Sequence, residues 1–309
     1  MTSNQQAVAW ASDRLIGLAG LAAQDMPAGA LYVVATPIGN VADFTLRALW
    51  VLAHADAIAA EDTRITRSLL ARYEIASPRH GVFAAHAHNE RVAGQRILAL
   101  LAGGARVALV TDAGTPAVSD PGARIVASAR GAGYRVVPIP GPSSTLAALS
   151  AAGFAEGGFR FIGFLPTGAR NRARFLSDAA SRGESFVMFE APHRVVATLR
   201  ELAAVLAPER RVLVARELTK IHETLTIGAA SELGAWVKQH EARGEYVIAV
   251  DAAAEVAATG IDAVTRRWLN ALAEELPASR AAAVAAKATG IPRDVLYAAL
   301  GRGKPRSAP

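Results

Sequence analysis

Cysteine is absent from the 309-residue sequence, which excludes disulfide bonds and metal sites built on thiolates. Long hydrophobic runs are missing too, since no segment reaches the roughly 18 uninterrupted apolar residues that a membrane-spanning helix needs. The first ten residues, MTSNQQAVAW, lack the basic start and compact apolar stretch of a signal peptide. We therefore expect a cytoplasmic protein that does not enter a membrane.

Motifs of several common enzyme classes are also missing. The sequence has no G-x-G-x-x-G after its first expected strand and no G-x-x-x-x-G-K-[ST], so it lacks the usual dinucleotide fingerprint and a P-loop. It has no G-x-S-x-G elbow of the kind found in α/β hydrolases. Its seven histidines form no H-E-x-x-H, and His86 and His88 stand without a paired carboxylate motif. We therefore predict no metal site.

The composition that is present indicates a globular and basic protein. Hydrophobic residues make up 52% and charged residues 19%, which excludes a disordered chain. The formal net charge is +6 and the sequence pI about 10.0, as expected for a polyanion-binding protein but equally for a merely basic soluble one. Basic residues cluster at 170–174, 209–211 and 301–306, which favours nucleic acid as the partner.

Short apolar, β-branched runs alternate with longer helical patterns from residue 31 onward, which predicts α/β layers with mostly parallel sheets. The glycine-rich segment 151–158 is typical of a domain boundary. We divide the chain into a leader at 1–28, an N-terminal α/β domain at 29–150, a C-terminal α/β domain at 151–255 and a helical tail at 262–309. The expected strands are 31–36, 57–60, 106–111, 135–139, 159–164, 185–189, 211–215, 222–227 and 245–250, and the expected helices are about 43–54, 64–72, 90–102, 122–131, 144–151, 170–181, 193–206 and 229–240.

The tail contains no expected strand. Its stretch SRAAAVAAKATGIPRDVLYAAL predicts a helix, a short turn at Thr289–Pro292 and a second helix, which is the size of a helix-turn-helix unit. A plain helical hairpin used for packing or dimerisation fits the same pattern equally well.

Polar, glycine and proline residues follow six of the expected strands. The loops are PIGN, EDTR, DAGTPAVSD, PGPSS, EAPHR and RELTK, after the strands that begin at 31, 57, 106, 135, 185 and 211. Each loop alone fits a simple turn, and Ser143 or Ser144 fits a helix N-cap. Ligands of open parallel sheets bind at the carboxyl ends of strands, so six such loops together predict a ligand site. Asp112, at a strand tip, can accept hydrogen bonds from ribose hydroxyls or an amine.

These loops resemble the motifs of a known group of proteins. The stretches LYVVATPIGN, AAEDTR, TDAGTPAVSDPG, PIPGPSS, FIGFLP, FEAPHR and ARELTKIHE occur in the order found in the tetrapyrrole methylase superfamily. They are most similar to its ribosomal branch, the small-subunit rRNA (cytidine-2′-O)-methyltransferases. The resemblance runs from about residue 30 to 251 and continues into the tail, but it leaves 1–28 outside.

The resemblance implies that S-adenosylmethionine (SAM) binds in a cleft between two α/β domains of a homodimer. It also implies methyl transfer to the ribose 2′-oxygen of a cytidine in the decoding region of 16S rRNA, in the 30S subunit. Glycine and small residues suit such a site because they let backbone groups approach the ligand closely. Carried over by motif, the cofactor-binding residues are Pro37, Ile38, Asp112, Ala113, Gly114, Thr115, Ser143, Ser144, Phe189, Ala215 and Glu245.

A ribose hydroxyl is a weak acid, so its methylation benefits from a base or a strong hydrogen-bond acceptor. We expect Glu61 and Lys220 nearest the chemistry. Glu61 could instead form a salt bridge with Arg64 or Arg67. Lys220 can act as a base only in its neutral form, which burial favours, and otherwise holds a phosphate. Further catalytic candidates are Asp62, His193 and Glu223, and Arg64, Arg67, Arg194 and Lys220 are expected to hold the RNA backbone.

Two other functions remain open at this point. A small-molecule methylase of the same superfamily would act on a tetrapyrrole, although the basic pI and the helical tail weigh against it. A non-enzymatic RNA-binding module would use the tail and would bind no SAM.

Overall fold

The computed structural model describes residue 15 and residues 17–154, 157–237, 243–253, 261 and 263–301. The chain forms two compact units, of which the first comprises the chain up to Ala147 together with Leu218–His222. The second comprises Ala148–Glu217 and the chain from Glu223 onward. The sequence placed this division near residue 150 and did not anticipate that Leu218–His222 would group with the first unit.

The first unit is built on a five-stranded sheet in the order β3-β2-β4-β1-β5, in which every pairing is parallel. Parallel strands need crossovers, and helices provide most of them here. The strands are β1 (Ala30–Val34), β2 (Ala57–Ala60), β3 (Val82–Ala84), β4 (Val107–Val110) and β5 (Arg135–Ile139). The helices are α2 (Leu46–His54), α3 (Thr63–Arg72), α4 (Glu90–Ala102) and α5 (Ala123–Gly131), with short 3₁₀ turns η1 (Leu21–Ala23) and η2 (Val41–Asp43).

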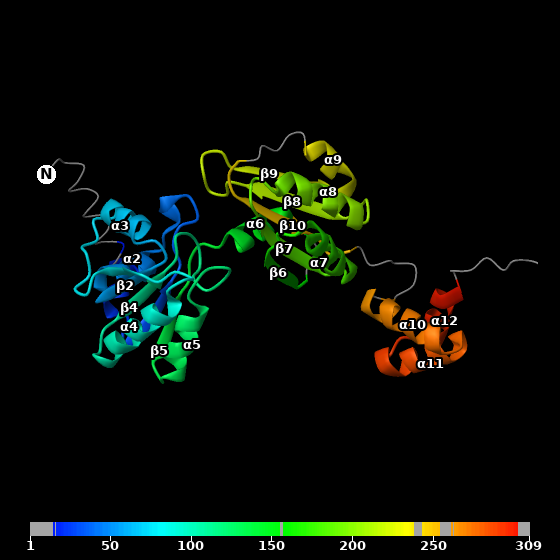
Figure 1. The fold of residues 1–309 in the computed structure, drawn as a ribbon, viewed down its shortest axis with the longest axis horizontal. Coiled ribbons are helices and arrows are strands. Elements are labelled where there is room, and N and C mark those ends of the chain that lie inside the picture. Colours follow the sequence, from blue (N-terminus) through cyan, green and yellow to red (C-terminus); the bar gives the residue numbers. More distant parts are fainter. Residues whose placement is uncertain are drawn as a thin grey trace, which may run out of the picture. The chain divides into compact units, whose positions relative to one another are not determined.

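Helices cover both faces of this sheet. On one face, α2 and α3 pack against Ile58, Ala108 and neighbouring strand residues, and on the other, α4 and α5 pack against Val107 and Leu109 (Figure 1). All four residues of β4 are buried because alternate side chains enter the two cores. This double burial explains why the strands read as continuous apolar runs in the sequence.

One strand of the first sheet was not predicted. β3 has three residues, Val82–Ala84, which is too short a run for hydrophobic alternation to be detected. The expected helix at 43–54 begins later, at Leu46, because the hydroxyl of Thr45 accepts a hydrogen bond from the Ala48 N–H and caps it.

The second unit contains another five-stranded sheet, in the order β6-β7-β10-β8-β9. Only β6 and β7 pair in parallel, while the other three pairings are antiparallel, so the expectation of mostly parallel strands is wrong for this sheet. The cause is local: no helix separates β8 from β9, and β10 inserts between β7 and β8 with the opposite direction. The strands are β6 (Phe159–Phe164), β7 (Ser185–Glu190), β8 (Arg211–Arg216), β9 (Thr224–Ala229) and β10 (Tyr246–Val250).

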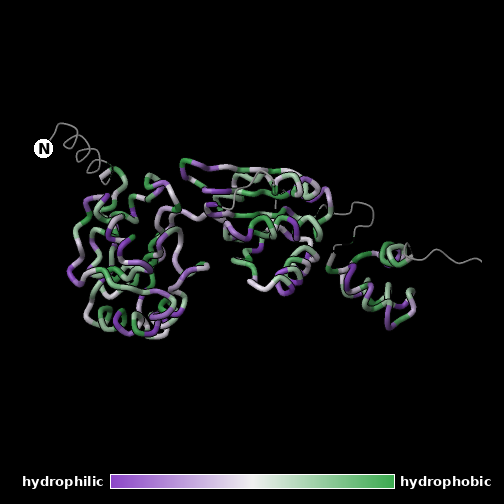
Figure 2. The backbone as a smooth tube through the Cα atoms, turned by 45° about the horizontal axis from the view of Figure 1, so that its top comes forward, coloured by the Kyte–Doolittle hydropathy of each residue, from purple (hydrophilic) through white to green (hydrophobic). Residues whose placement is uncertain are grey.

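One face of the second sheet packs against helices around Phe186, Met188, Val214 and Ile248. Figure 2 shows hydrophobic residues along the strands and more hydrophilic residues in many of the loops. The expected helix at 229–240 is a 3₁₀ turn followed by a short helix, and residues 238–242 lie outside the described residues. The helical elements are α6 (Ser144–Ala152), within which the division between the units falls, α7 (Ala169–Ser181), α8 (Val195–Val205), η3 (Ala230–Glu232) and α9 (Leu233–Trp236).

The described residues of the tail form three helices, α10 (Ala263–Glu275), α11 (Ala278–Thr289) and α12 (Arg293–Gly301). α11 ends at Gly290, which adopts the left-handed conformation (φ 75°) and leads into the predicted turn before α12. A small core around Leu269, Ala285 and Leu296 joins the three helices, of which α10 was not predicted. Most of the basic stretch at 301–306 lies outside the described residues. None of the helices in the described part of the chain is both long and apolar enough for a bilayer crossing.

Candidate active site

Four loops of the first unit leave the carboxyl ends of parallel strands and therefore lie at one edge of the sheet. They follow β1, β2, β4 and β5. This edge carries most of the residues that the sequence predicts for the site: Pro37 and Ile38 after β1, Glu61 and Asp62 after β2, Asp112, Ala113, Gly114 and Thr115 after β4, and Ser143 and Ser144 at the end of the β5 loop.

The loops after β1 and β4 are joined by an antiparallel bridge. The Thr36 N–H donates to the Gly114 carbonyl at 2.9 Å, and the Gly114 N–H donates to the Thr36 carbonyl at 3.0 Å. The Thr36 hydroxyl adds a bond to the Thr111 carbonyl at 3.1 Å. Gly114 has φ 81°, a conformation that an L-residue rarely adopts, and a Cβ there would lie 3.5 Å from Ile38 Cγ2. Glycine therefore lets the two loops meet closely.

The β5 loop packs against both of these loops. The Thr115 hydroxyl donates to the Pro142 carbonyl at 3.3 Å. A Cβ on Gly141 would lie 2.9 Å from Ala35 Cβ, so only glycine fits here without movement. Ser143 Oγ lies 3.5 Å from the Leu146 N–H, which is the weak N-cap that the alternative interpretation of this serine expects. The three loops thus form one rigid, small-residue surface.

Two carboxylates tie the β2 loop to the β4 loop. The Thr111 hydroxyl donates to Glu61 Oε2 at 2.5 Å, and the Asp112 N–H lies 3.3 Å from the same oxygen. In return, the Asp62 N–H donates to Asp112 Oδ1 at 3.0 Å. The arrangement orients the Glu61 carboxylate through one of its oxygens. Burial raises the pKa of the Asp112 carboxyl, while the Asp62 N–H opposes that shift.

Asp120, in the loop after β4, belongs to this group of carboxylates. The N-cap of α5 is Gly122, which has no side-chain cap. Burial, followed by the charges of Glu61 and Asp112, raises the pKa of Asp120 to about 6, and the Thr111 hydroxyl opposes that shift. The SDPG stretch alone could not reveal this, because the contact depends on how the loop folds back onto β4.

The Glu61 carboxylate is held by Thr111 rather than by the arginines of α3. Arg64 forms a close ion pair with Asp62 at 2.5 Å, and this contact lowers the pKa of Asp62 to about 2. Arg67 donates to the Thr63 hydroxyl at 3.2 Å and to the Val82 carbonyl at 3.1 Å. The Arg64 side chain remains 86% exposed and is available to a partner molecule.

Lys220 lies in the segment that groups with the first unit, against the loop after β1. The Asn40 N–H donates to the Thr219 hydroxyl at 3.0 Å. A Cβ placed on Gly39 would stand 2.5 Å from Lys220 Cγ. The aliphatic stem of this lysine thus occupies the space that any other residue at position 39 would need, and the side chain is half-buried.

The remaining predicted residues lie in the second unit, also at one edge of its sheet. The rings of Phe189 and Phe161 meet edge to face, 5.0 Å apart, and Ala215 is fully buried. The Glu245 N–H donates to Glu217 Oε1 at 2.8 Å. His193 and Glu223 are exposed. The loops after β7 and β8 share this edge with the start of β10, because β7 and β8 both run opposite to β10.

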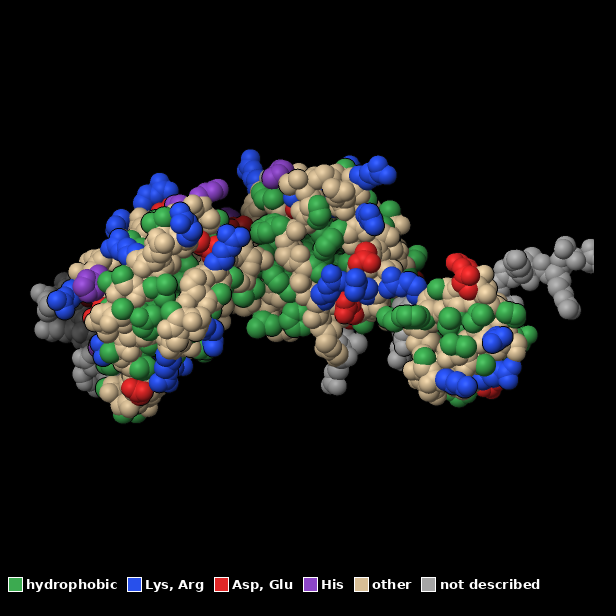
Figure 3. Space-filling view, turned by 60° about the horizontal axis from the view of Figure 1, so that its bottom comes forward, with side chains coloured by type: hydrophobic (Ala, Val, Ile, Leu, Met, Phe, Trp, Pro, Cys, Tyr) green, Lys and Arg blue, Asp and Glu red, His purple; other side chains and the backbone are tan. Residues whose placement is uncertain are grey.

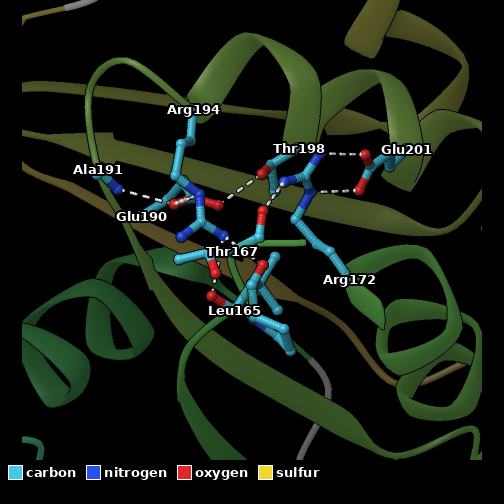
Figure 4. A network of polar contacts seen from close by, with 9 residues as sticks. Leu165, Thr167, Arg172, Glu190, Ala191, Arg194, Thr198 and Glu201 are labelled. Carbon is cyan, nitrogen blue, oxygen red and sulfur yellow. Dashed lines mark hydrogen bonds and ion pairs between the residues drawn. The ribbon is translucent and has the colours of Figure 1, made fainter. Parts of the chain in front are cut away.

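Arg194 points into a polar network of the second unit (Figure 4). Its guanidinium donates to the Leu165 and Pro166 carbonyls at 2.9 and 3.0 Å. Its Nε lies 3.2 Å from Glu190 Oε1, an ion pair without hydrogen-bond geometry. With the side chain only 15% exposed, Arg194 holds the loop after β6 in place. We therefore leave it out of the RNA surface proposed below.

The same network accounts for part of the basic stretch at 170–174. Arg172 forms a bidentate pair with Glu201, at 2.8 and 2.6 Å, which joins α7 to α8 (Figure 4). Arg170 and Arg174 are exposed.

The two-sheet α/β architecture is shared with solved methyltransferases. A solved cobalamin-biosynthesis enzyme, cobalt precorrin-4 methyltransferase, superposes with a TM-score of 0.55 at 20% identity, covering 74% of this chain and 98% of its own. The methyltransferase CobJ gives a TM-score of 0.54 at 21% identity, with 73% and 95% coverage. At such low sequence identity, these similarities show a shared fold and nothing about the function of this chain.

The chain belongs to the tetrapyrrole (corrin/porphyrin) methylase family, whose model matches residues 30–234. A second model, the RsmI C-terminal HTH domain, matches residues 259–303. The ribosomal RNA small subunit methyltransferase I of Xylella fastidiosa is 45% identical over 87% of this chain and 98% of its own length. Its counterpart from Escherichia coli O157:H7 is 43% identical over 88% and 95%. The family resemblance predicted from the sequence is thus confirmed.

The methyl donor of this family is SAM, which confirms the predicted cofactor. The loop edge of the first unit fits such a ligand. Gly114 and Gly141 let the loops after β1, β4 and β5 pack closely together, and Asp112 offers a carboxylate beside them. Among the side chains that the structure describes, no group of three or more His, Asp or Glu could hold a metal ion.

Proposed function

We propose that this chain methylates the ribose 2′-oxygen of a cytidine in the decoding region of 16S rRNA. The observation that carries the proposal is its identity of more than 40% to ribosomal RNA small subunit methyltransferases I over nearly their whole length. The substrate is the rRNA of the 30S subunit, and we accordingly place the reaction in the cytoplasm. We also propose that the protein acts as a homodimer with SAM in a cleft between two α/β domains, as the family resemblance implies.

SAM supplies a methyl group on a sulfonium centre, and the protein contributes mainly positioning. The bridged loops after β1, β4 and β5 form the rigid wall on which the donor rests. Glu61 accepts the proton of the 2′-hydroxyl, and its orientation is set by Thr111 on the other carboxylate oxygen. Lys220 stands beside the β1 loop and holds the RNA phosphate or the attacking oxygen.

RNA contacts are proposed for Arg64, Arg67 and Lys220, with further contacts from the tail. On the face drawn in Figure 3, Lys and Arg side chains lie in small groups on each part of the molecule. Such a dispersed surface suits a folded RNA, which is recognised largely by shape. We expect the target cytidine to be flipped out of its stack toward Glu61. A complex in which the nucleotide stays stacked while receiving the methyl group would contradict this.

Calorimetric titration with SAM tests the cofactor site directly. Asp112→Ala should weaken SAM binding at least about tenfold, which corresponds to the loss of one charge-assisted hydrogen bond. Asp178→Ala, which removes an exposed carboxylate of α7, is the control and should bind normally. Normal binding by Asp112→Ala would refute this site. A protein that binds no SAM at all would point to an RNA-binding module instead.

The substrate is tested by offering the same enzyme two acceptors. Methyl transfer to 30S subunits, mapped to a cytidine 2′-oxygen, is the expected result. Transfer to a porphyrinogen with none to 30S subunits would overturn the proposal in favour of a small-molecule methylase.

A further inference from the structure

The segment that carries Lys220 has an unusual backbone. Glu217 (φ 52°) and Thr219 (φ 65°) both adopt the left-handed conformation, which non-glycine residues rarely take. Leu218 between them is buried. Glu217 is held at its place by a hydrogen bond from its N–H to the Glu245 carbonyl at 3.0 Å. Backbone strain of this kind persists only where surrounding contacts impose it, and it concentrates at functional sites.

The contacts that impose this conformation on Thr219 come from the loop after β1. The Thr219 hydroxyl accepts a hydrogen bond from the Asn40 N–H at 3.0 Å. A Cβ on Gly39 would lie 2.9 Å from that hydroxyl oxygen and 3.0 Å from the Leu218 carbonyl oxygen. Gly39 has no positive φ, so its lack of a side chain serves the close approach and not a turn.

The same glycine sets the position of the lysine stem. A Cβ at position 39 would stand 2.5 Å from Lys220 Cγ, which is near the root of the side chain and cannot swing away cheaply. The residue before Gly39 is Ile38, whose Cγ2 lies against Gly114 of the β4 loop. Lys220 is thus packed onto the loop that is itself bridged to the proposed SAM-binding stretch.

The residue type at position 220 is also unusual for this chain. Only four of its 33 basic residues are lysines, and no lysine precedes position 220. Position 220 therefore carries an amine in a chain whose other basic residues are almost all arginines. A lysine side chain ends in a compact ammonium, whereas an arginine side chain ends in a planar guanidinium fork.

We propose that Gly39 and Thr219 are positioning residues for Lys220: they fix its stem against the loop after β1 so that its ammonium stands at the methyl-transfer site. The inference rests on the proposed function for the role of Lys220, but the placement of the amine can be tested without any substrate.

The first experiment measures the reactivity of the amine in the full-length protein. An N-hydroxysuccinimide ester of acetate acylates exposed lysines, and peptide mass spectrometry follows Lys220 with the exposed Lys287 as internal reference. Gly39→Ala and Thr219→Val should each raise the acylation rate of Lys220 at least about threefold relative to Lys287, because the lysine side chain is then no longer packed against the loop after β1. Gly131→Ala, at a glycine with no atom within 4 Å of the added Cβ, is the control. An unchanged Lys220 rate in both variants would overturn the proposal.

The second experiment measures methylation of 30S subunits. Thr219→Val should lower kcat at least about fivefold in the wild-type background and leave it unchanged in the Lys220→Ala background, because coupled residues are not additive. An equal loss in both backgrounds would mean a merely structural role and would overturn the inference. If the wild-type protein did not methylate 30S subunits while the acylation shift appeared, the proposed function would fail and the placement of Lys220 would stand.

Discussion

At the scale of single residues, Asp120 gives the clearest pH dependence. Its pKa is raised to about 6 in the folded protein, against 3.8 as the ordinary value, and burial is the main cause. The stability that the raised pKa contributes is fully present below pH 3.8 and is lost as the pH rises through 6. Asp120→Asn should therefore raise the free energy of unfolding at pH 8 by about 1–2 kcal/mol, allowing for partial solvent screening, and by almost nothing at pH 4.

Urea denaturation at pH 4, 6 and 8 measures this difference. The control is Asp178→Asn, because the ion pair with Arg182 lowers the pKa of Asp178 and gives the opposite sign. That variant should lose a little stability at pH 8. A benefit of Asp120→Asn that is equal at all three pH values would show that the carboxylate is not buried as described.

At Lys220, a substitution can separate the effect of the positive charge from the effect of the side-chain shape. Lys220→Arg keeps the positive charge but replaces the compact ammonium with a planar guanidinium. We expect kcat/KM for 30S subunits to fall by about 10- to 100-fold, since lysine and arginine are not equivalent where the fit is tight. SAM affinity measured by calorimetry should stay the same. Full activity of the arginine variant would mean that only charge matters at this position.

At the scale of secondary-structure elements, the buried pair of Arg172 and Glu201 joins α7 to α8. Glu201→Ala should cost about 2–4 kcal/mol of unfolding free energy, because it leaves the guanidinium, whose side chain is 10% exposed, without its partner. The double variant Arg172→Met/Glu201→Leu should recover most of this loss. Thermal and urea unfolding measure both.

The pair of Asp178 and Arg182 on the same helix is the matched control. Both side chains are more than 40% exposed, and Asp178→Ala should cost far less unfolding free energy than Glu201→Ala. If Glu201→Ala and Asp178→Ala lowered the free energy of unfolding by comparable amounts, burial would not be what makes the Arg172–Glu201 pair matter.

The elements also show what a sequence can predict. The four loops of the first unit were predicted because apolar strands end abruptly in glycine, proline and acidic residues, and parallel strands bring such ends together. The strand β3 was missed because three residues give no period. The burial of Arg172 and Arg194 was missed because it depends on partners that lie 28 or 29 residues away in the sequence: Glu201 for Arg172, and the Leu165 and Pro166 carbonyls for Arg194.

At the scale of the whole molecule, the three tail helices provide an RNA-facing surface in our proposal. Val264, Arg267 and Trp268 lie on α10 at the spacing i, i+3 and i+4, and all three are exposed. A Trp that is 66% exposed beside an arginine suits stacking on an unpaired base and contact with a phosphate. Nothing in the small tail core needs either side chain, since that core is built around Leu269, Ala285 and Leu296.

Trp268→Ala should therefore raise the KM for 30S subunits by about 5- to 50-fold, the loss expected for one stacked base. Arg267→Ala should reduce the slope of log K against log salt by about one phosphate contact. SAM affinity should be unchanged in both variants, because the proposed cofactor site involves no tail residue. Val284→Ala, at an exposed apolar position of α11, is the control. If Trp268→Ala left the KM and the tail fold unchanged, α10 would not face the ribosome, and the RNA contacts of the tail would have to come from another of its faces.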